Sequence, residues 1–174
     1  MSVKRIAKDG ILLALLCAIG MFSIPLGENV KVSLQFLMLL IIYSLADHWL
    51  DKILIPALYL ALGLIAPIYS GFMAGITPTF GFVIAFTVAG IPFHFMMKYI
   101  KINFYVKFIL SALVSLIIVY LGGVIFMKFY LDISLEKTLL IAVVPYLPFD
   151  AVKIAIALLV VKVLPPSIKP SEIN

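Results

Sequence analysis

Residues 108–127 read FILSALVSLIIVYLGGVIFM, a run of twenty residues without a charged side chain. A helix of that length covers about 30 Å, the thickness of the hydrocarbon core of a bilayer. The rest of the chain has the same character: 65% of its 174 residues are hydrophobic, 12% are charged, and the mean hydropathy is +1.26. Soluble domains carry about 25% charged residues. The sequence therefore predicts an all-α integral membrane protein.

Charged residues, prolines and glycines divide residues 1–174 into six predicted transmembrane helices that form a single domain. Their expected ranges are 10–24, 34–46, 53–67, 78–97, 108–127 and 139–163. We expect Pro145 and Pro148 to interrupt the last helix, because proline lacks an amide donor and clashes with the preceding turn. The carbonyl groups freed at such a break must find other partners or line a cavity.

The distribution of basic residues predicts the orientation, because Lys and Arg concentrate in short cytoplasmic loops. With six helices and both termini inside, the inner segments hold nine basic residues and the outer loops hold three. The inner ones are Lys4, Arg5, Lys8, Lys52, Lys98, Lys101, Lys107, Lys162 and Lys169, and the outer ones are Lys31, Lys128 and Lys137. We therefore expect cytoplasmic N- and C-termini. This asymmetry accounts for the net charge of +5 without a nucleic-acid partner.

The segment Pro145-Tyr-Leu-Pro-Phe-Asp-Ala-Val-Lys153 places two charges in otherwise apolar sequence. Asp150 and Lys153 are three residues apart, so they project from one face of a helix. Ionisable residues inside a membrane mark functional sites by default. In the predicted orientation both lie just inside the outer face. The alternative is structural: Asp150 caps the last half-helix, and Lys153 extends toward the interface or pairs with it.

Other features at the same depth predict a pocket that opens to the outside. Gln35 and Thr79 would supply neutral hydrogen-bonding groups to it. Aromatic residues would supply its apolar walls, namely Tyr69, Phe80, Phe82, Tyr146 and Phe149. A mostly apolar pocket with one cation and one acceptor suits a small amphiphilic molecule that carries a carboxylate and an amide-like or ring-nitrogen group.

Several motifs of enzymes are missing from the sequence. It has no phosphate-binding Gly-x-x-x-x-Gly-Lys-Ser/Thr loop, no Gly-x-Ser-x-Gly nucleophile, no His-Glu-x-x-His metal pair and no paired carboxylates. We therefore predict no catalytic residues, metal site or cofactor, and no enzymatic activity. If the chain moves a solute uphill, a partner subunit or an ion gradient must supply the energy.

Three stretches of the chain resemble a known family: SIPLGENVKVSLQ at 23–35, YLALGL at 59–64 and PYLPFDAVK at 145–153. They are similar to segments of the substrate-binding S components of energy-coupling factor (ECF) transporters, in the biotin-specific branch called BioY. The resemblance implies a multi-pass protein of the bacterial cell membrane with six helices and an outward-opening vitamin site. It also implies that the subunit captures biotin, while two cytoplasmic ATPase subunits hydrolyse the ATP that drives uptake.

The resemblance also implies roles for particular residues. Asp150 and Lys153 fall on the ligand-contacting pair of the family. Ala14 and Ala18 match a small-residue element of the first helix that contacts the shared transmembrane T subunit. From the residues alone, two small side chains one turn apart allow another helix to approach closely, and they also occur by chance in apolar sequence.

The chain departs from the biotin branch at two places. It reads Thr77-Pro-Thr-Phe-Gly-Phe82 where the branch usually has Gly-Pro-Thr-Gly-Gly-Tyr, and Phe149 where glycine is usual. Phenylalanine in place of glycine fills volume near the expected pocket. The alternative ligands are therefore another carboxylated vitamin or analogue, such as lipoate or a biotin precursor. A non-transport membrane scaffold or channel protein is the alternative from another class.

Overall fold

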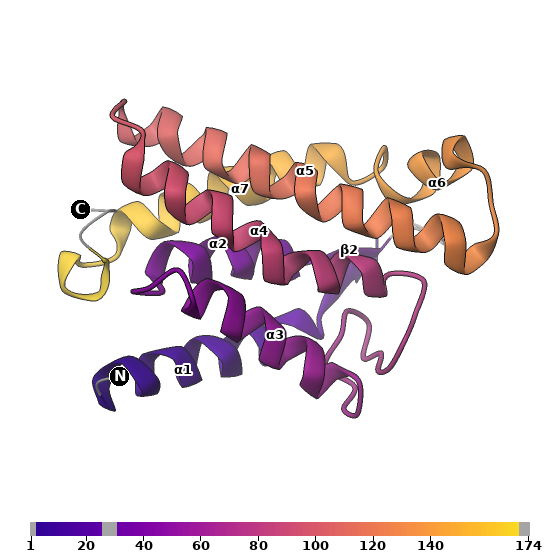
Figure 1. The fold of residues 1–174 in the computed structure, drawn as a ribbon, viewed down its shortest axis with the longest axis horizontal. Helices are drawn as coiled ribbons and strands as arrows, with labels where there is room; N and C mark the ends of the chain where they lie inside the picture. Colours follow the sequence, from indigo (N-terminus) through magenta and orange to yellow (C-terminus); the bar gives the residue numbers. More distant parts are fainter. Residues whose placement is uncertain (1–2, 26–30, 171–174) are drawn as a thin grey trace.

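The computed structural model describes residues 3–25 and 31–170, and these residues are mostly helical (Figure 1). The elements in chain order are α1 (Val3–Gly20), β1 (Ser23–Pro25), β2 (Lys31–Ser33), α2 (Gln35–Leu45), α3 (Asp51–Gly63), α4 (Phe80–Tyr99), α5 (Phe104–Leu131), α6 (Leu135–Ala142), α7 (Leu147–Val163) and the short 3-10 helix η1 (Pro166–Ile168). β1 and β2 form an antiparallel hairpin. Residues 26–30, which carry the middle of the SIPLGENVKVSLQ segment, lie outside the described residues.

The long helices α4 and α5 lie side by side along one side of the molecule, and α1 and α3 lie on the other (Figure 1). Within the described residues, α4 and α5 are the two helices that are long and apolar enough to cross a membrane alone. α6 and α7 together make a third candidate, bent by 47° at residues 143–146. Pro148 lies in the first turn of α7, where its missing amide costs no intrahelical hydrogen bond. The predicted break beside Pro145 and Pro148 is therefore present.

Helix α2 forms the centre of the fold. Its sequence QFLMLLIIYSL has no charged residue, and nine of its residues are buried. A helix that is apolar on every side packs inside a protein, and α2 contacts α1, α3, α4 and α7. Its length is roughly 16 Å, about half of the hydrocarbon core of a bilayer. These four helices therefore pack around α2.

The helix ends differ from the predicted ranges, most at α1 and α5. α5 extends four residues beyond the range 108–127 at each end, and α1 begins seven residues before residue 10. Lysine is a good helix former, so Lys107 and Lys128 mark the end of an apolar run without ending the helix. Asn103 sets the start of α5, because its side chain accepts a hydrogen bond from the Tyr105 amide at 2.9 Å. Charged residues thus show where an apolar run ends, whereas capping side chains such as Asn103 show where a helix begins.

Ion pairs fix the N-terminal end of α1 against the turn between α2 and α3. The Arg5 guanidinium donates from Nε and Nη2 to both oxygens of Asp51, at 2.8 and 2.6 Å. Lys8 Nζ donates to Asp47 Oδ1 at 2.6 Å. The two pairs differ in burial, since the Asp51 side chain is fully buried whereas that of Asp47 is 42% exposed. The Arg5–Asp51 pair is therefore the one that stabilises the position of α1.

Replacing Arg5 with Gln is expected to lower the stability of the purified protein by about 3 kcal/mol, because the buried Asp51 charge loses its bidentate partner. Thermal unfolding in detergent measures this effect. The matched control is Lys8→Gln, which removes an exposed ion pair and should cost less than about 1 kcal/mol. Equal losses in the two variants would contradict a special role for the buried pair. Adding Asp51→Asn to Arg5→Gln should recover part of the loss.

Candidate functional site

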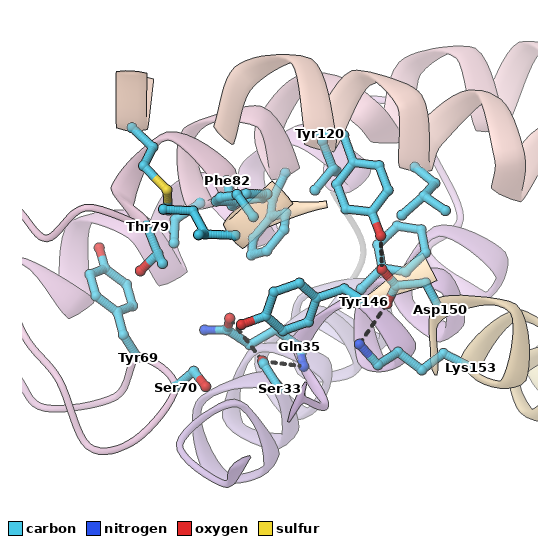
Figure 2. Close-up of a pocket in the computed structure, with 18 residues that line it drawn as sticks. Ser33, Gln35, Tyr69, Ser70, Thr79, Phe82, Tyr120, Tyr146, Asp150 and Lys153 are labelled. Carbon is cyan, nitrogen blue, oxygen red and sulfur yellow. Dashed lines mark hydrogen bonds and ion pairs between the residues drawn. The ribbon is translucent and has the colours of Figure 1, made fainter. Parts of the chain in front are cut away.

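A cavity lies among α2, α4, α5 and α7 and the loop that follows α3 (Figure 2). Seven of the nine predicted binding residues line it: Gln35, Tyr69, Thr79, Phe82, Tyr146, Asp150 and Lys153. They come from segments more than a hundred residues apart in the sequence. The fold therefore brings the predicted polar and aromatic residues to one place.

The polar groups at one end of the cavity are Asp150 and Lys153. Lys153 Nζ donates to Asp150 Oδ1 at 2.6 Å, and only 8% and 6% of the two side chains are exposed. The other carboxylate oxygen, Oδ2, accepts a hydrogen bond from the Tyr120 hydroxyl on α5. Asp150 lies in the first turn of α7, where the helix dipole favours a negative charge. Removing one partner of a buried ion pair leaves an uncompensated charge, so the two side chains depend on each other.

Gln35 is held at the other end of the cavity by hydrogen bonds on both sides of its amide. The Ser33 hydroxyl donates to Gln35 Oε1 at 3.0 Å, and Gln35 Nε2 donates to the Tyr59 hydroxyl at 2.5 Å. Tyr59 in turn donates to the Ile68 carbonyl at 2.8 Å. A side-chain amide carries two N–H groups. One is used by Tyr59, so the second can serve a bound molecule.

Tyr69 forms part of the cavity wall and is held in place by the end of α3. A Cβ atom on Gly63 would lie 2.0 Å from the Tyr69 ring, so only glycine allows this approach. The Tyr69 hydroxyl donates to the Leu60 carbonyl at 2.7 Å. Burial raises the pKa of Tyr69 to about 12. The hydroxyl therefore stays protonated at neutral pH and keeps this hydrogen bond.

Two of the predicted wall residues, Phe80 and Phe149, lie outside the cavity lining. The Phe80 ring packs between Tyr69 and Phe126, with ring centroids 6.3 and 5.8 Å away. Residues two apart on a helix point to different sides, so Phe82 faces the cavity and Phe80 does not. Phe149, next to Asp150 on α7, is half-buried and lies outside the lining. The Phe80 side chain thus fills space between Tyr69 and Phe126, outside the cavity.

The sequence reasoning missed several lining residues. Three carry polar groups, namely Ser33, Ser70 and Tyr120. The other eight are apolar residues of the helices, namely Phe36, Val83, Phe86, Leu116, Val119, Met127, Ile141 and Ala142. A feature of the sequence could have identified Tyr120. It is the single tyrosine in the run 108–127, and a tyrosine hydroxyl inside an apolar helix usually finds a hydrogen-bond partner. Ser70 lies in the irregular loop between α3 and α4, where no helical periodicity predicts which way a side chain points.

Ala14 and Ala18 are not among the cavity-lining residues and are exposed on α1. The buried residues of α1 are Leu12, Leu16 and Gly20, which form a narrow stripe on another face of the helix. The structure therefore leaves the surface around the two alanines uncovered.

Comparison with known proteins gives two relatives that match nearly the whole chain. The biotin transporter BioY of Thermotoga maritima is 28% identical over 164 residues, which are 91% of this chain and 94% of the relative. The crystal structure of the S component for biotin from an ECF-type ABC transporter superposes with a TM-score of 0.79 at 23% identity, and covers 91% of this chain and 88% of that one. At this identity the structural likeness shows a shared fold.

The family comparison gives the widest match. The model of the BioY family matches residues 1–170. This confirms the resemblance found in the segments at 23–35, 59–64 and 145–153. Together with the apolar helices, it identifies a multi-pass protein of the cell membrane. The chain, with its buried Asp150–Lys153 pair in a cavity between apolar helices, belongs to the BioY family.

Proposed function

We propose that this protein is the membrane-embedded, biotin-binding S component of an ECF-type importer. The observation that carries the proposal is the Asp150–Lys153 pair, buried in a largely apolar cavity of a BioY-family chain. Ligand sites of this kind are mostly apolar with a few placed polar groups. A purely structural ion pair would have no need of a cavity beside it.

The polarity of the cavity supports one orientation of biotin. The cyclic urea of biotin offers N–H donors beside a carbonyl acceptor, and Asp150 and Lys153 offer an acceptor beside a donor. The carboxylate of biotin would be repelled by Asp150 if it bound Lys153, because the two charges are only 2.6 Å apart. We therefore place the urea ring at the Asp150–Lys153 pair. The carboxylate then lies toward the neutral groups at the other end, which are Ser33, Gln35, Ser70 and Thr79 (Figure 2).

The chain works within a larger assembly in this proposal. It crosses the membrane six times, with both termini in the cytoplasm and the cavity open to the outside. The exposed surface of α1 around Ala14 and Ala18 contacts the transmembrane T subunit, since small residues allow close helix packing. Two cytoplasmic ATPase subunits supply the energy. The chain itself binds biotin and has no ATPase site or cofactor.

Equilibrium binding of labelled biotin to the purified protein in detergent tests the proposal. Unlabelled biotin, desthiobiotin, lipoate and other vitamins serve as competitors. We expect saturable, high-affinity binding that biotin displaces and lipoate does not, because lipoate has no urea to pair with Asp150 and Lys153. Displacement by lipoate alone would assign the cavity to a different carboxylated ligand. A folded protein that binds none of these vitamins would contradict the transport function and favour a scaffold.

A further inference from the structure

Tyr120 completes a three-residue hydrogen-bonded group at the polar end of the cavity. Its hydroxyl donates to Asp150 Oδ2, while Lys153 Nζ donates to Oδ1 of the same carboxylate (Figure 2). Tyr120 comes from α5, and the other two residues come from α7. The carboxylate is therefore fixed from two sides by groups on different helices.

This arrangement restricts the rotation of the carboxylate. A buried carboxylate with one partner can turn to place both oxygens around that partner, and Lys153 would then attract both. The hydrogen bond from Tyr120 prevents this, because it holds Oδ2 toward α5. Each carboxylate oxygen has two acceptor positions, so Oδ2 can accept a second hydrogen bond while Tyr120 holds it. Hydrogen bonds to an ionised carboxylate are also stronger than neutral ones, which makes the restraint firm.

We propose that Tyr120 is a positioning residue that holds Asp150 in the orientation in which it accepts an N–H group of the ligand. This inference rests on the proposed function and assigns a new residue to it. Tyr120 thereby helps to select ligands with an N–H donor, such as cyclic ureas, over carboxylated molecules without one.

Tyr43 is a tyrosine whose hydroxyl bonds to the backbone of a neighbouring helix and not to a group of the proposed ligand site. Tyr43 on α2 is fully buried, its hydroxyl donates to the Phe86 carbonyl, and it does not line the cavity. Both Tyr120 and Tyr43 thus make one hydrogen bond between helices. Only Tyr120 makes it to a charged group that faces the ligand. Tyr43→Phe is therefore the matched control for Tyr120→Phe.

The test is a double-substitution cycle measured as biotin affinity in detergent. Tyr120→Phe keeps the ring and removes the hydroxyl, and we expect it to weaken binding about tenfold or more, the size of a lost hydrogen bond to a charged group. Asp150→Asn removes the charge and keeps one acceptor oxygen. If Tyr120 acts through Asp150, the double variant should bind biotin about as weakly as Asp150→Asn alone, and Tyr43→Phe should stay within about twofold of the unmodified protein.

The proposal is overturned if the two losses multiply, because independent effects would do so. It is also overturned if Tyr120→Phe leaves biotin affinity unchanged, or if Tyr43→Phe weakens binding as much as Tyr120→Phe does. Biotin binding by the unmodified protein distinguishes a failure of this proposal from a failure of the proposed function. If that protein binds no biotin, the proposed function fails. If it binds biotin and any of the three results above is found, only the role of Tyr120 fails.

Discussion

Replacing Lys153 with Ala is expected to weaken biotin binding by about 2–5 kcal/mol, which is roughly a thirtyfold to several thousandfold loss of affinity. Lys153 is the cation at the end of the cavity where the urea carbonyl is proposed to bind, and its side chain is buried. Its removal deletes a desolvated contact with the ligand. It also leaves the buried Asp150 side chain with the Tyr120 hydroxyl as its remaining side-chain partner among the described residues. Equilibrium binding of labelled biotin in detergent measures the loss.

Lys162→Ala is the matched control, because this lysine lies on the same helix α7, is exposed, and is placed over the Tyr105 ring outside the cavity. It should leave biotin affinity unchanged within about twofold. Adding Asp150→Asn to Lys153→Ala should recover any folded-state stability that the unpaired buried charge has cost, as measured by thermal unfolding, and should not recover biotin affinity. Unchanged affinity in the Lys153→Ala protein would show that the pair serves the fold and not the ligand.

If α1 contacts the T subunit as proposed, the combined substitution of Ala14 and Ala18 with Leu is expected to reduce biotin uptake about tenfold or more when the protein is expressed with the T and ATPase subunits of the proposed importer. Leucine side chains on this face of α1 would keep the partner helix at a distance. The loss of about 1.4 kcal/mol of association energy is enough for a tenfold effect. Binding of biotin to the isolated subunit should not change, because both alanines are outside the cavity lining.

The control for this prediction is Ala155→Leu, the same change at an exposed position of α7. It should allow normal uptake and normal binding. Two measurements are needed, uptake into cells and co-purification of the subunit with its partners. Normal uptake by the Ala14→Leu, Ala18→Leu protein would show that the partner contacts another face.

The helices of this protein follow from local properties of the sequence. α5 is apolar over more than a span's length, and α2 is apolar on every side, so each has to be helical and removed from water. The break between α6 and α7 follows from Pro145 and Pro148. The exact helix ends could not be predicted in this way, because capping groups such as Asn103 and the loop contacts of Tyr69 decide them.

The charged residues of the candidate site could be predicted from the sequence. Asp150 and Lys153 stand out because ionisable groups in apolar sequence are costly and rare. Phe80 and Phe82 were harder, since two aromatic residues two positions apart cannot face the same cavity, and the sequence alone does not say which one does. The structure turns Phe82 inward and packs Phe80 against Phe126.

Local patterns in the sequence are enough to establish that this chain consists of apolar helices. They also show that a proline break precedes the last long helix and that a charged pair follows the break. The sequence also carries the segments that relate the chain to the BioY family. Which side chains meet in the cavity depends on the tertiary packing of the helices. Tyr120 joins Asp150 from thirty residues away, and Gln35 meets Tyr59 from twenty-four. Such contacts depend on how the helices are rotated and packed, which is set by long-range contacts that no local pattern encodes.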